Sequence, residues 1–515
     1  MIITNLNSLF QGIALTAKTV AGTLGPNGRL VLLENPDTLV DTTPFYVTQD
    51  GARVISEIKL PKNDYRYLGV ELIKNAVNKL KEEVGDGSTT FTIIVNALLQ
   101  EAKKYIAAGH DPIGISKQLK EIQDKLCTQL ELISYPIETR YDLFTVAKIA
   151  SKSAELAELI TTAIELQGQE GQIIVEETKQ VYVGLERISG YQLDRGYIHD
   201  AFINVGYTEC ILENPLILLT DYSLMSSEAI KFITKHNVNN SPLLIITPEI
   251  GEHALTELIE YNKKIPCCVI KNPSFPISRI KRLLEWTEDI AIFTGATLIS
   301  KETGRVLKYL KLDDLGSVKK AIIKKNSTIL LGGTGLQENI NKQVYGLEEQ
   351  AKWLKNDFDR ERAKLRATQL TGNIIAIKVG GYTDYEVKYI KRLIEDALAS
   401  CKSAIRKGVV AGTGLANLYA LKQCSHNLLA YKIVEKALQE PFLTLTNGNK
   451  VLLNEILNYN SPYISYNVLT NKTHNMYMTG VLDTTETCQN IIKYAFSLAS
   501  ELISSQYIVI KERKI

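Results

Sequence analysis

Residues 85–90 read Gly85-Asp86-Gly87-Ser88-Thr89-Thr90, and they stand directly before an apolar helical pattern through Phe91, Ile94 and Leu98. Ser and Thr are favoured at helix N-termini, where backbone N–H groups without a helical partner bind anions. The carboxylate of Asp86 suits Mg²⁺, which prefers one or two carboxylates together with phosphate oxygens. The stretch lacks the Walker A pattern GxxxxGK[ST]. It therefore indicates either a phosphate site or a plain helix cap.

The composition excludes several classes of protein. The 515 residues include 59 basic and 57 acidic residues, a net charge of +2, and 45% hydrophobic residues. At roughly 100–200 residues per domain, this length predicts about three domains. The near-zero charge and the lack of any apolar run of roughly 20 residues argue against nucleic acid and membrane as partners. The seven cysteines form no CxxC pair and are odd in number, which predicts free thiols in a reducing compartment and no structural zinc.

Helical and strand-rich patterns divide the chain into three parts. The first 130 residues are mostly helical, with a short apolar strand at 30–33. From about 172 to 300, short β-rich runs such as 216–219 and 243–246 alternate with helical stretches, as in an α/β domain. Helical character returns after about 340. This order predicts one domain inserted into another.

Three further segments contain residue types that suit a nucleotide. The turn Thr23-Leu24-Gly25-Pro26-Asn27-Gly28-Arg29 has two glycines that let backbone N–H groups approach a ligand. The capping box Thr383-Asp384-Tyr385-Glu386 predicts the start of a helix that carries Asp396 beside its apolar stripe and ends at Gly408. The run Gly408-Val409-Val410-Ala411-Gly412-Thr413-Gly414 lets a backbone pass close to a flat group. Each segment also has a plainer interpretation: a helix-to-strand turn, a solvated acid and a packing turn.

Taken together and in this order, these segments resemble the group I chaperonins, the GroEL-type 60-kDa ring subunits. The resemblance runs over nearly the whole chain with few gaps. The matching stretches are Thr23-Leu24-Gly25-Pro26, Asp50-Gly51, Gly85-Asp86-Gly87-Ser88-Thr89-Thr90, Asp194-Arg195-Gly196-Tyr197, Pro242-Leu243-Leu244-Ile245-Ile246, Glu395-Asp396-Ala397-Leu398, Gly408-Val409-Val410-Ala411-Gly412 and Leu482-Asp483. So many ordered matches are far more specific than any single motif.

The resemblance implies the chaperonin fold, a multidomain α+β and α/β architecture. A mainly helical equatorial ATP-binding domain would cover 1–132 and 407–515. A small α/β intermediate hinge domain would cover 133–188 and 375–406, and an inserted α/β apical polypeptide-binding domain 189–374. Hinges are expected at Pro136 with Gly408, and at Gly190 with Gly372-Asn373.

The resemblance also implies ATP and Mg²⁺ as cofactors, with K⁺ as a further candidate cation. Asp396 would position or activate the water that attacks the γ-phosphate, Asp50 would support it, and Asp86 would hold Mg²⁺. The residues that would bind the nucleotide are Thr23, Leu24, Gly25, Pro26, Gln49, Gly87, Ser88, Thr89, Thr90, Gly412, Thr413, Asn467, Val468 and Asp483. The residues that would present apolar side chains to unfolded polypeptide are Tyr197, Phe202, Ile230, Ile233, Leu255 and Ile259.

Several positions depart from the family pattern. Gln49 replaces a lysine, which removes a positive charge near the phosphates. Thr413 replaces a glycine at the adenosine loop, where a β-branched side chain is expected to crowd the nucleotide. Val468 and Leu469 replace two alanines, and Glu260 puts a charge at the edge of the polypeptide-binding surface. These changes predict nucleotide binding with altered hydrolysis.

We therefore expect an ATP-driven folding chaperone that forms homo-oligomeric rings of 7 or 14 subunits, with a small co-chaperonin and unfolded polypeptides as partners. The alternative is a divergent paralogue that binds polypeptide or assembles with little or no ATP hydrolysis, as a holdase or scaffold. A small-molecule phosphotransferase is a third class, for which no acceptor motif stands in the sequence. The first charged residue is Lys18, so we expect no secretory signal and a location in a bacterial cytoplasm or, if organelle-encoded, the plastid stroma.

Overall fold

The structure is a computed structural model of the whole chain. It describes residues 2–34, 45–168, 173–178, 180–205, 209–226, 230–231, 233–234, 240–271, 280–300, 303–354, 356–424 and 428–510.

Internal contacts divide the chain into two compact units. The first comprises residues 1–169, 177–183 and 379–515, and the second comprises residues 170–176 and 184–378. The predicted insertion of one part of the chain into another is therefore present. The first unit contains both the predicted equatorial segments and most of the predicted intermediate ones, so the three-domain boundaries stay a prediction.

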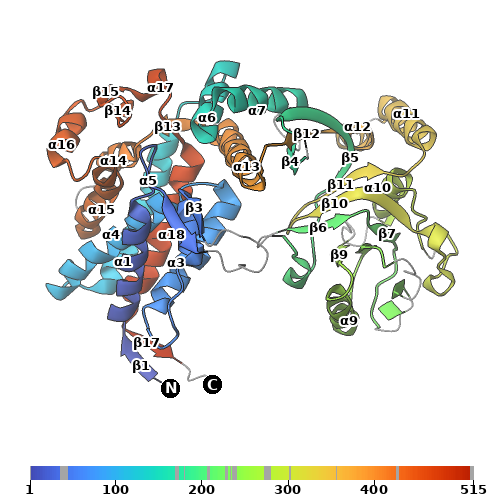
Figure 1. Ribbon diagram of the computed structural model, residues 1–515, viewed down its shortest axis with the longest axis horizontal. Helices are drawn as coiled ribbons and strands as arrows, with labels where there is room; N and C mark the ends of the chain where they lie inside the picture. Colours follow the sequence, from blue (N-terminus) through green and yellow to red (C-terminus); the bar gives the residue numbers. More distant parts are fainter. Residues whose placement is uncertain are drawn as a thin grey trace. The chain divides into compact units, whose positions relative to one another are not determined.

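Long amphipathic helices form the core of the first unit (Figure 1). Phe91, Ile94 and Leu98 of one helix are fully buried, and their spacing places them on one helical face. Phe442 and Phe496 from other helices join the same core. The helices of this bundle are α1 (Asn7–Ala21), α2 (Gly51–Glu57), α3 (Tyr67–Val84), α4 (Ser88–Ala107), α5 (Pro112–Leu132), α14 (Leu415–Lys422), α15 (Leu429–Leu445), α16 (Lys450–Asn458), α17 (Met476–Thr479) and α18 (Thr485–Ser504).

Short antiparallel ladders tie distant segments of the first unit together. The two ends of the chain pair as strands, with Ile2 opposite Ile510, and the predicted strand at 30–33 is present with its bounds moved by one residue. The pairs are β1 (Ile2–Asn5) with β17 (Tyr507–Ile510), β2 (Val31–Glu34) with β3 (Phe45–Thr48), β13 (Val409–Ala411) with β16 (Leu482–Thr484), and β14 (Ile464–Asn467) with β15 (Lys472–Asn475).

Three more helices of the first unit pack on one another: α6 (Arg140–Ser151), α7 (Ala154–Gln167) and α13 (Asp384–Lys407). The predicted bounds of α13 are confirmed. The Thr383 hydroxyl accepts from the Glu386 N–H at 3.1 Å, and Gly408 ends the helix with φ +74°. At the N-terminal end of α13, the Glu386 carboxylate also accepts from the Tyr382 N–H at 2.9 Å. The side chains of Thr383 and Glu386 therefore each accept a backbone N–H there.

The second unit is built on one nine-stranded mixed sheet. The strand order is β4-β12-β5-β11-β10-β7-β8-β9, and β6 pairs with β10. The strands are β4 (Ile173–Glu177), β5 (Gly184–Leu193), β6 (Cys210–Glu213), β7 (Leu216–Leu219), β8 (Leu243–Thr247), β9 (Cys267–Lys271), β10 (Gly316–Ile323), β11 (Thr328–Gly333) and β12 (Asn373–Val379). The parallel strands β7, β8 and β9 read as continuous apolar runs because both of their faces are covered.

Helices and short 3₁₀ turns accompany this sheet. They are α9 (Glu252–Asn262), α10 (Ile280–Thr294), α11 (Gln337–Trp353), α12 (Asp357–Thr371), η1 (Asp200–Phe202), η2 (Leu307–Tyr309) and η3 (Leu312–Asp314). Arg366 on α12 and Asp289 on α10 form a buried bidentate ion pair, with Nε–Oδ2 and Nη2–Oδ1 distances of 2.6 and 2.9 Å. This pair fixes the two helices against each other inside the core.

The segments predicted as hinges lie side by side. The Tyr135 N–H donates to the Val409 carbonyl, and the Val409 N–H to the Tyr135 carbonyl, both at 2.8 Å. In the second unit the Gly190 N–H donates to the Gly372 carbonyl at 3.0 Å. Their role as hinges stays a prediction.

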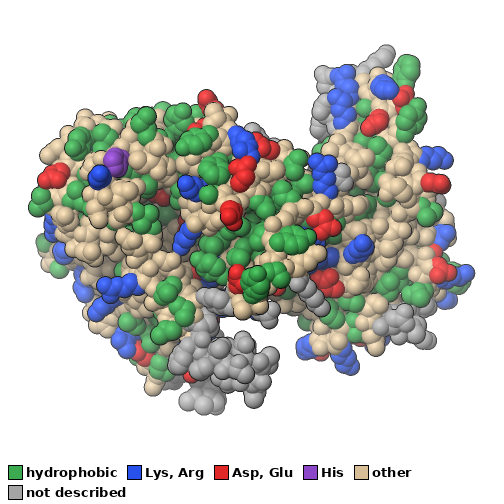
Figure 2. Space-filling model, turned by 45° about the horizontal axis from the view of Figure 1, so that its top comes forward, with side chains coloured by type: hydrophobic (Ala, Val, Ile, Leu, Met, Phe, Trp, Pro, Cys, Tyr) green, Lys and Arg blue, Asp and Glu red, His purple; other side chains and the backbone are tan. Residues whose placement is uncertain are grey.

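Three further features concern the charged side chains, the hydropathy of the helices and the cysteines. Basic and acidic side chains are interspersed over the face shown in Figure 2, in keeping with the net charge of +2. Within the described ranges, no helix combines the length and apolar character needed to cross a membrane. All seven cysteines are buried and unpaired, as predicted.

Candidate nucleotide site

The glycine-rich stretch joins the end of α3 to the start of α4. Gly85 and Gly87 have φ values of +75° and +92°, in the left-handed region that glycine adopts without steric penalty. This turn lets α4 begin at Ser88, so the N–H groups of its first turn point out of the helix end. The exposed Asp86 carboxylate accepts a hydrogen bond from the Gly87 N–H at 2.6 Å. The loop therefore presents N–H donors and one carboxylate at the same place.

The turn at residues 23–28 lies against this helix start. Gly25 has φ +75°, and the Gly28 N–H donates to its carbonyl at 3.1 Å. The hydroxyls of Thr23 and Thr89 are 3.3 Å apart although 66 residues separate them in sequence. A Cβ atom added to Gly51 would collide with the Thr89 hydroxyl. The structure thus brings together three of the predicted segments, the turn with Leu24 and Pro26, the start of α2, and the start of α4 with Thr90.

Asp50 is the N-cap of α2 and one of the two predicted catalytic carboxylates. Its Oδ1 accepts from the Ala52 N–H at 2.9 Å. Its Oδ2 lies 3.3 Å from Lys81 Nζ and 3.7 Å from an Arg392 guanidinium nitrogen. Burial alone would raise the pKa of Asp50, but Lys81 and Arg392 outweigh it and hold that pKa below its ordinary value. Asp50 is therefore an ionised anchor rather than a proton acceptor.

The pKa of Asp396 is shifted in the opposite direction from that of Asp50. Burial on α13 raises its pKa from 3.8 to about 7, and the negative charges of Asp86 and Asp50 add to this, while Lys81 and Arg392 oppose it. Arg392, four residues before Asp396 on α13, lies 3.7 Å from Asp50 Oδ2, so this part of α13 lies beside the N-terminus of α2. A carboxyl group with a pKa close to neutrality is suited to take a proton from water at physiological pH.

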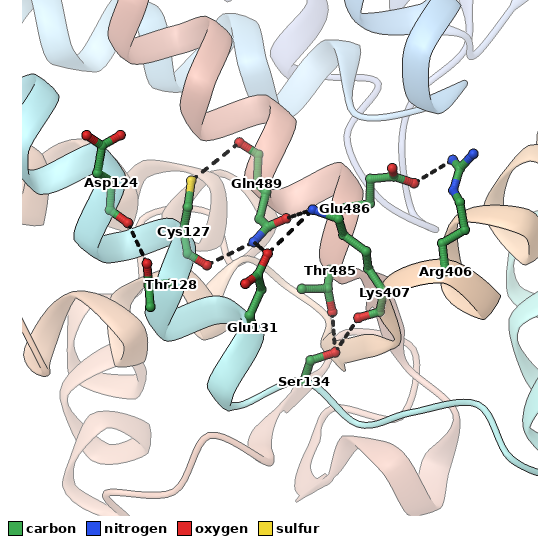
Figure 3. Close-up of polar contacts among 10 residues, drawn as sticks. All are labelled: Asp124, Cys127, Thr128, Glu131, Ser134, Arg406, Lys407, Thr485, Glu486 and Gln489. Carbon is green, nitrogen blue, oxygen red and sulfur yellow. Dashed lines mark hydrogen bonds and ion pairs between the residues drawn. The ribbon is translucent and has the colours of Figure 1, made fainter.

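Polar contacts fix the C-terminal end of α13, the helix that carries Asp396 (Figure 3). The Lys407 ammonium donates to Gln489 Oε1 at 2.9 Å and lies 3.5 Å from Glu131 Oε1. The Ser134 hydroxyl donates to the Lys407 carbonyl at 2.7 Å. Arg406 pairs with Glu486 at 2.6 Å. Because these partners belong to α5, α18 and the segment after α5, the position of α13 is tied to the helical core.

The segments predicted around the adenosine also converge. The Asn27 side chain, from the turn at 23–28, donates to the Val468 carbonyl at 3.4 Å across 441 residues of sequence. The Asn467 side chain accepts from the Leu469 N–H at 2.9 Å and so shapes the loop that follows β14. Asp483 on β16 lies opposite Val410 on β13. Segments from both ends of the chain therefore meet where the adenosine is predicted to bind.

Asp483 is exposed to solvent, and its protein surroundings remove part of its hydration. This surrounding raises the pKa of Asp483, Asp86 raises it further, and a hydrogen bond from the Gly414 N–H opposes both. Gly412 leads into this turn, and its N–H donates to the Val481 carbonyl at 2.9 Å.

Thr413 adopts a strained backbone conformation, and the crowding of the nucleotide expected from its β-branched side chain stays a prediction. Its φ is +73°, which is a genuine outlier for a β-branched residue. Its hydroxyl hydrogen-bonds with the Ser465 hydroxyl. The side chain that replaces a family glycine is thus held against β14 rather than left free in the loop.

Three cations at the site were missed by the sequence analysis. Lys81 and Arg392 contact Asp50 as described, and Lys152 Nζ donates to Gln49 Oε1 at 3.0 Å. The Gln49 amide nitrogen in turn donates to the Gly28 carbonyl at 2.7 Å. Of the three, only Arg392 could have been predicted from the sequence. It stands four residues before Asp396 and therefore lies on the same helix face.

The comparisons with known proteins agree with this geometry. The family model of the TCP-1/cpn60 chaperonin family matches residues 16–261 and 262–513. The chain belongs to the TCP-1/cpn60 chaperonin family. Two crystal structures of the chaperonin gp146 from the bacteriophage EL 2 (Pseudomonas aeruginosa), both determined in presence of ATP-BeFx, are similar in fold. Each is 19% identical over 100% of both chains, with TM-scores of 0.67 and 0.62. The predicted family and chaperonin fold are confirmed.

The residues of this chaperonin fit a nucleotide-bound Mg²⁺ rather than a protein-only metal site. Within the described ranges, no three His, Cys, Asp or Glu side chains gather as ion ligands. Mg²⁺ is commonly held by one or two carboxylates together with substrate phosphates and water. The exposed Asp86 beside the start of α4 is such a carboxylate.

The six apolar residues expected to face unfolded polypeptide differ in burial, and their contact with polypeptide stays a prediction. Tyr197, Phe202, Ile230 and Ile233 are buried in the core of the second unit, because strands and helices of that unit pack over them. Leu255 and Ile259 on α9 keep part of their surface exposed, next to the exposed Glu260. Of the six, these two have the more accessible side chains in this structure.

Proposed function

We propose that this chaperonin is an ATP-dependent folding chaperone whose first unit binds and hydrolyses ATP with Mg²⁺. The proposal is supported mainly by the convergence of five segments, from Thr23 to Asp483. They surround two carboxyl groups whose pKa values shift in opposite directions, down for Asp50 and up for Asp396. Such pairs, in which one group is held ionised and the other titrates near neutrality, mark acid and base roles.

Each residue then has a role in phosphoryl transfer. N–H groups of the 24–26 turn and of the start of α4 would hold the phosphates, and Asp86 would hold Mg²⁺, which when bound neutralises phosphate charge. Gly412, Thr413, Asn467, Val468 and Asp483 would line the adenosine. Asp396, with its pKa of about 7, would accept the proton of the attacking water. Asp50 would keep Lys81 in place beside it.

The polypeptide-binding role would fall to the second unit, with Leu255 and Ile259 on the exposed side of α9. Heptameric rings, single or stacked in pairs, and a small co-chaperonin complete the proposal. Family membership supports ring assembly and polypeptide binding in general, and the ring size and the cap are part of the proposal.

A second candidate function is a holdase or scaffold with little ATP hydrolysis. The strained Thr413 in the adenosine loop favours it, because a remodelled loop can bind nucleotide poorly.

The two candidates are separated by turnover of the purified oligomer. The experiment measures phosphate release with ATP in Mg²⁺ and in EDTA, and compares wild type with Asp86→Ala. The folding chaperone requires turnover in Mg²⁺ that is lost in EDTA and in Asp86→Ala. Client binding without any turnover would favour the holdase.

A further inference from the structure

The candidate nucleotide site contains several acidic side chains, and its basic side chains come from outside the predicted nucleotide-binding segments. Asp50 and Asp86 both act electrostatically on Asp396, and Asp86 also acts on Asp483. A bound triphosphate would add several more negative charges. Residue 49, the neighbour of Asp50, is a neutral glutamine. The positive charge that phosphoryl transfer needs must therefore come from elsewhere in the chain.

Arg392 has hydrogen-bonding capacity to spare. It stands 3.7 Å from Asp50 Oδ2, an oxygen that already accepts a hydrogen bond from Lys81 at 3.3 Å. The other Asp50 oxygen is used by the Ala52 N–H. The hydrogen bonds to Asp50 thus come from Ala52 and Lys81, while Arg392 acts on Asp50 through its charge and its guanidinium has five N–H donors. About a quarter of the Arg392 side chain is exposed (24%), so a ligand can reach it.

Lys152 is the second cation. It stands at the C-terminal end of α6 with φ +56°, and its ammonium donates to the Gln49 amide at 3.0 Å. The same amide donates to the Gly28 carbonyl in the phosphate-side turn. Among the ion pairs between described residues, Lys152 takes part in none, and its partner Gln49 is neutral. The glutamine therefore holds an uncompensated positive charge next to the turn.

Both cations are carried by one pair of packed helices. α6 and α13 pack on each other, and α13 carries Arg392 one turn before Asp396. A movement that brings Asp396 to the nucleotide would bring both cations with it.

We propose that Arg392 and Lys152 contact the phosphates of the bound nucleotide and supply the positive charge that position 49 lacks. This inference rests on the proposed function, because it deepens the assignment of the same site. Arg392, beside Asp396, contacts the terminal phosphate and stabilises the charge that develops during hydrolysis. Lys152, beside the 23–28 turn, contributes mainly to binding.

The test compares charge-removing variants with matched controls. Arg392→Gln and Lys152→Gln are compared with Lys388→Gln and Lys148→Gln, which remove an exposed lysine one turn earlier on α13 and α6. Each intact oligomer is titrated calorimetrically with ATP, ADP and inorganic tripolyphosphate, and kcat and KM for ATP are measured. Thermal unfolding checks the fold of every variant, and Arg392→Lys replaces Arg392→Gln if the latter does not fold.

We expect Arg392→Gln to lower kcat about 10- to 100-fold, as the loss of a charge-assisted phosphate contact does, with ADP affinity unchanged within about twofold. Arg392→Lys should lower kcat by a smaller factor because the planar fork is lost. Lys152→Gln should weaken ATP binding about tenfold, and adding Gln49→Lys should restore it to within about threefold. The two control variants should match wild type.

The outcomes separate this inference from the proposed function. If wild type hydrolyses ATP and the site variants behave like their controls, the charge assignment is overturned and the proposed function stands. Equal losses in the site and control variants overturn it too, since any surface lysine would then serve. If wild type binds tripolyphosphate but not ATP, the proposed function fails, and weaker tripolyphosphate binding by Lys152→Gln still supports the assignment. Binding of neither ligand by wild type overturns both.

Discussion

Replacing Asp396 with asparagine is expected to stabilise the first unit at alkaline pH while it removes ATP turnover. Burial raises the pKa of Asp396 from 3.8 to about 7, so the native state binds this proton more tightly than the unfolded chain does. The stability linked to this group is greatest at low pH and is lost as the pH rises through about 7. Asparagine has the shape of the carboxyl group and no charge to bury.

The magnitude follows from the size of the pKa change. The difference between 3.8 and about 7 corresponds to about 4 kcal/mol at pH 8, and to less than half of that at pH 5, where the native carboxyl is still protonated. Because Asp396 keeps some solvent-accessible surface, we expect about half of the difference between the two pH values to be measurable, about 1–2 kcal/mol.

Differential scanning calorimetry of wild type and Asp396→Asn at pH 5 and pH 8 measures this effect. For units of this size 1 kcal/mol corresponds to about 2–4 °C in Tm, so the Tm gain of the variant should be a few degrees larger at pH 8 than at pH 5. Glu455→Gln, at an exposed position on α16 of the same unit, is the control and should show no such difference. A variant that is destabilised at pH 8, or equally stabilised at both pH values, would refute the reasoning about burial.

Three more predictions follow from the two units. The kcat of wild type should rise between pH 6 and pH 8 with a midpoint near 7, as Asp396 loses its proton; a steady-state profile that falls over this range contradicts the role of Asp396 as base. Leu255→Ser and Ile259→Ser should weaken binding of a denatured client and cost less stability than Phe202→Ser, because these two side chains are only partly buried against the core. Phe202→Ser, at a fully buried position, should destabilise the second unit by about 3–5 kcal/mol. If all three variants change client binding and thermal unfolding equally, the polypeptide-binding surface is wrongly placed. Arg366→Met should destabilise the second unit by about 3–5 kcal/mol because it leaves the Asp289 carboxylate buried without its cation, and unchanged thermal unfolding would show that this pair is dispensable.

The sequence allowed prediction of the features that depend on neighbouring residues. The turn at 23–28, the start of α4 at Ser88 and both ends of α13 follow from glycine conformations and capping side chains, which act within a few residues. The apolar runs at 216–219 and 243–246 are strands of the buried parallel part of the sheet. Family motifs carried the assignment of fold and family, which the comparisons confirm.

Features that depend on tertiary packing were not predictable in this way. Lys81 and Lys152 approach Asp50 and Gln49 only because α3 and α6 lie where they do, and no motif marks either lysine. The burial of Phe202 and Ile230 likewise depends on neighbours far away in sequence. An apolar side chain on a helix or turn can face a core or a client, and only packing decides between the two.

The most direct test of the central claim is ATP turnover by the purified chaperonin in Mg²⁺, with Asp396→Ala measured alongside and refolding of a denatured client followed in the same samples. The account predicts that wild type releases phosphate and raises the refolded yield, and that the variant loses at least about 100-fold in turnover, as loss of a catalytic base does. If wild type and Asp396→Ala are equally inert, the ATP-driven cycle proposed for this chaperonin is wrong. If the two are equally active, Asp396 is not the catalytic base.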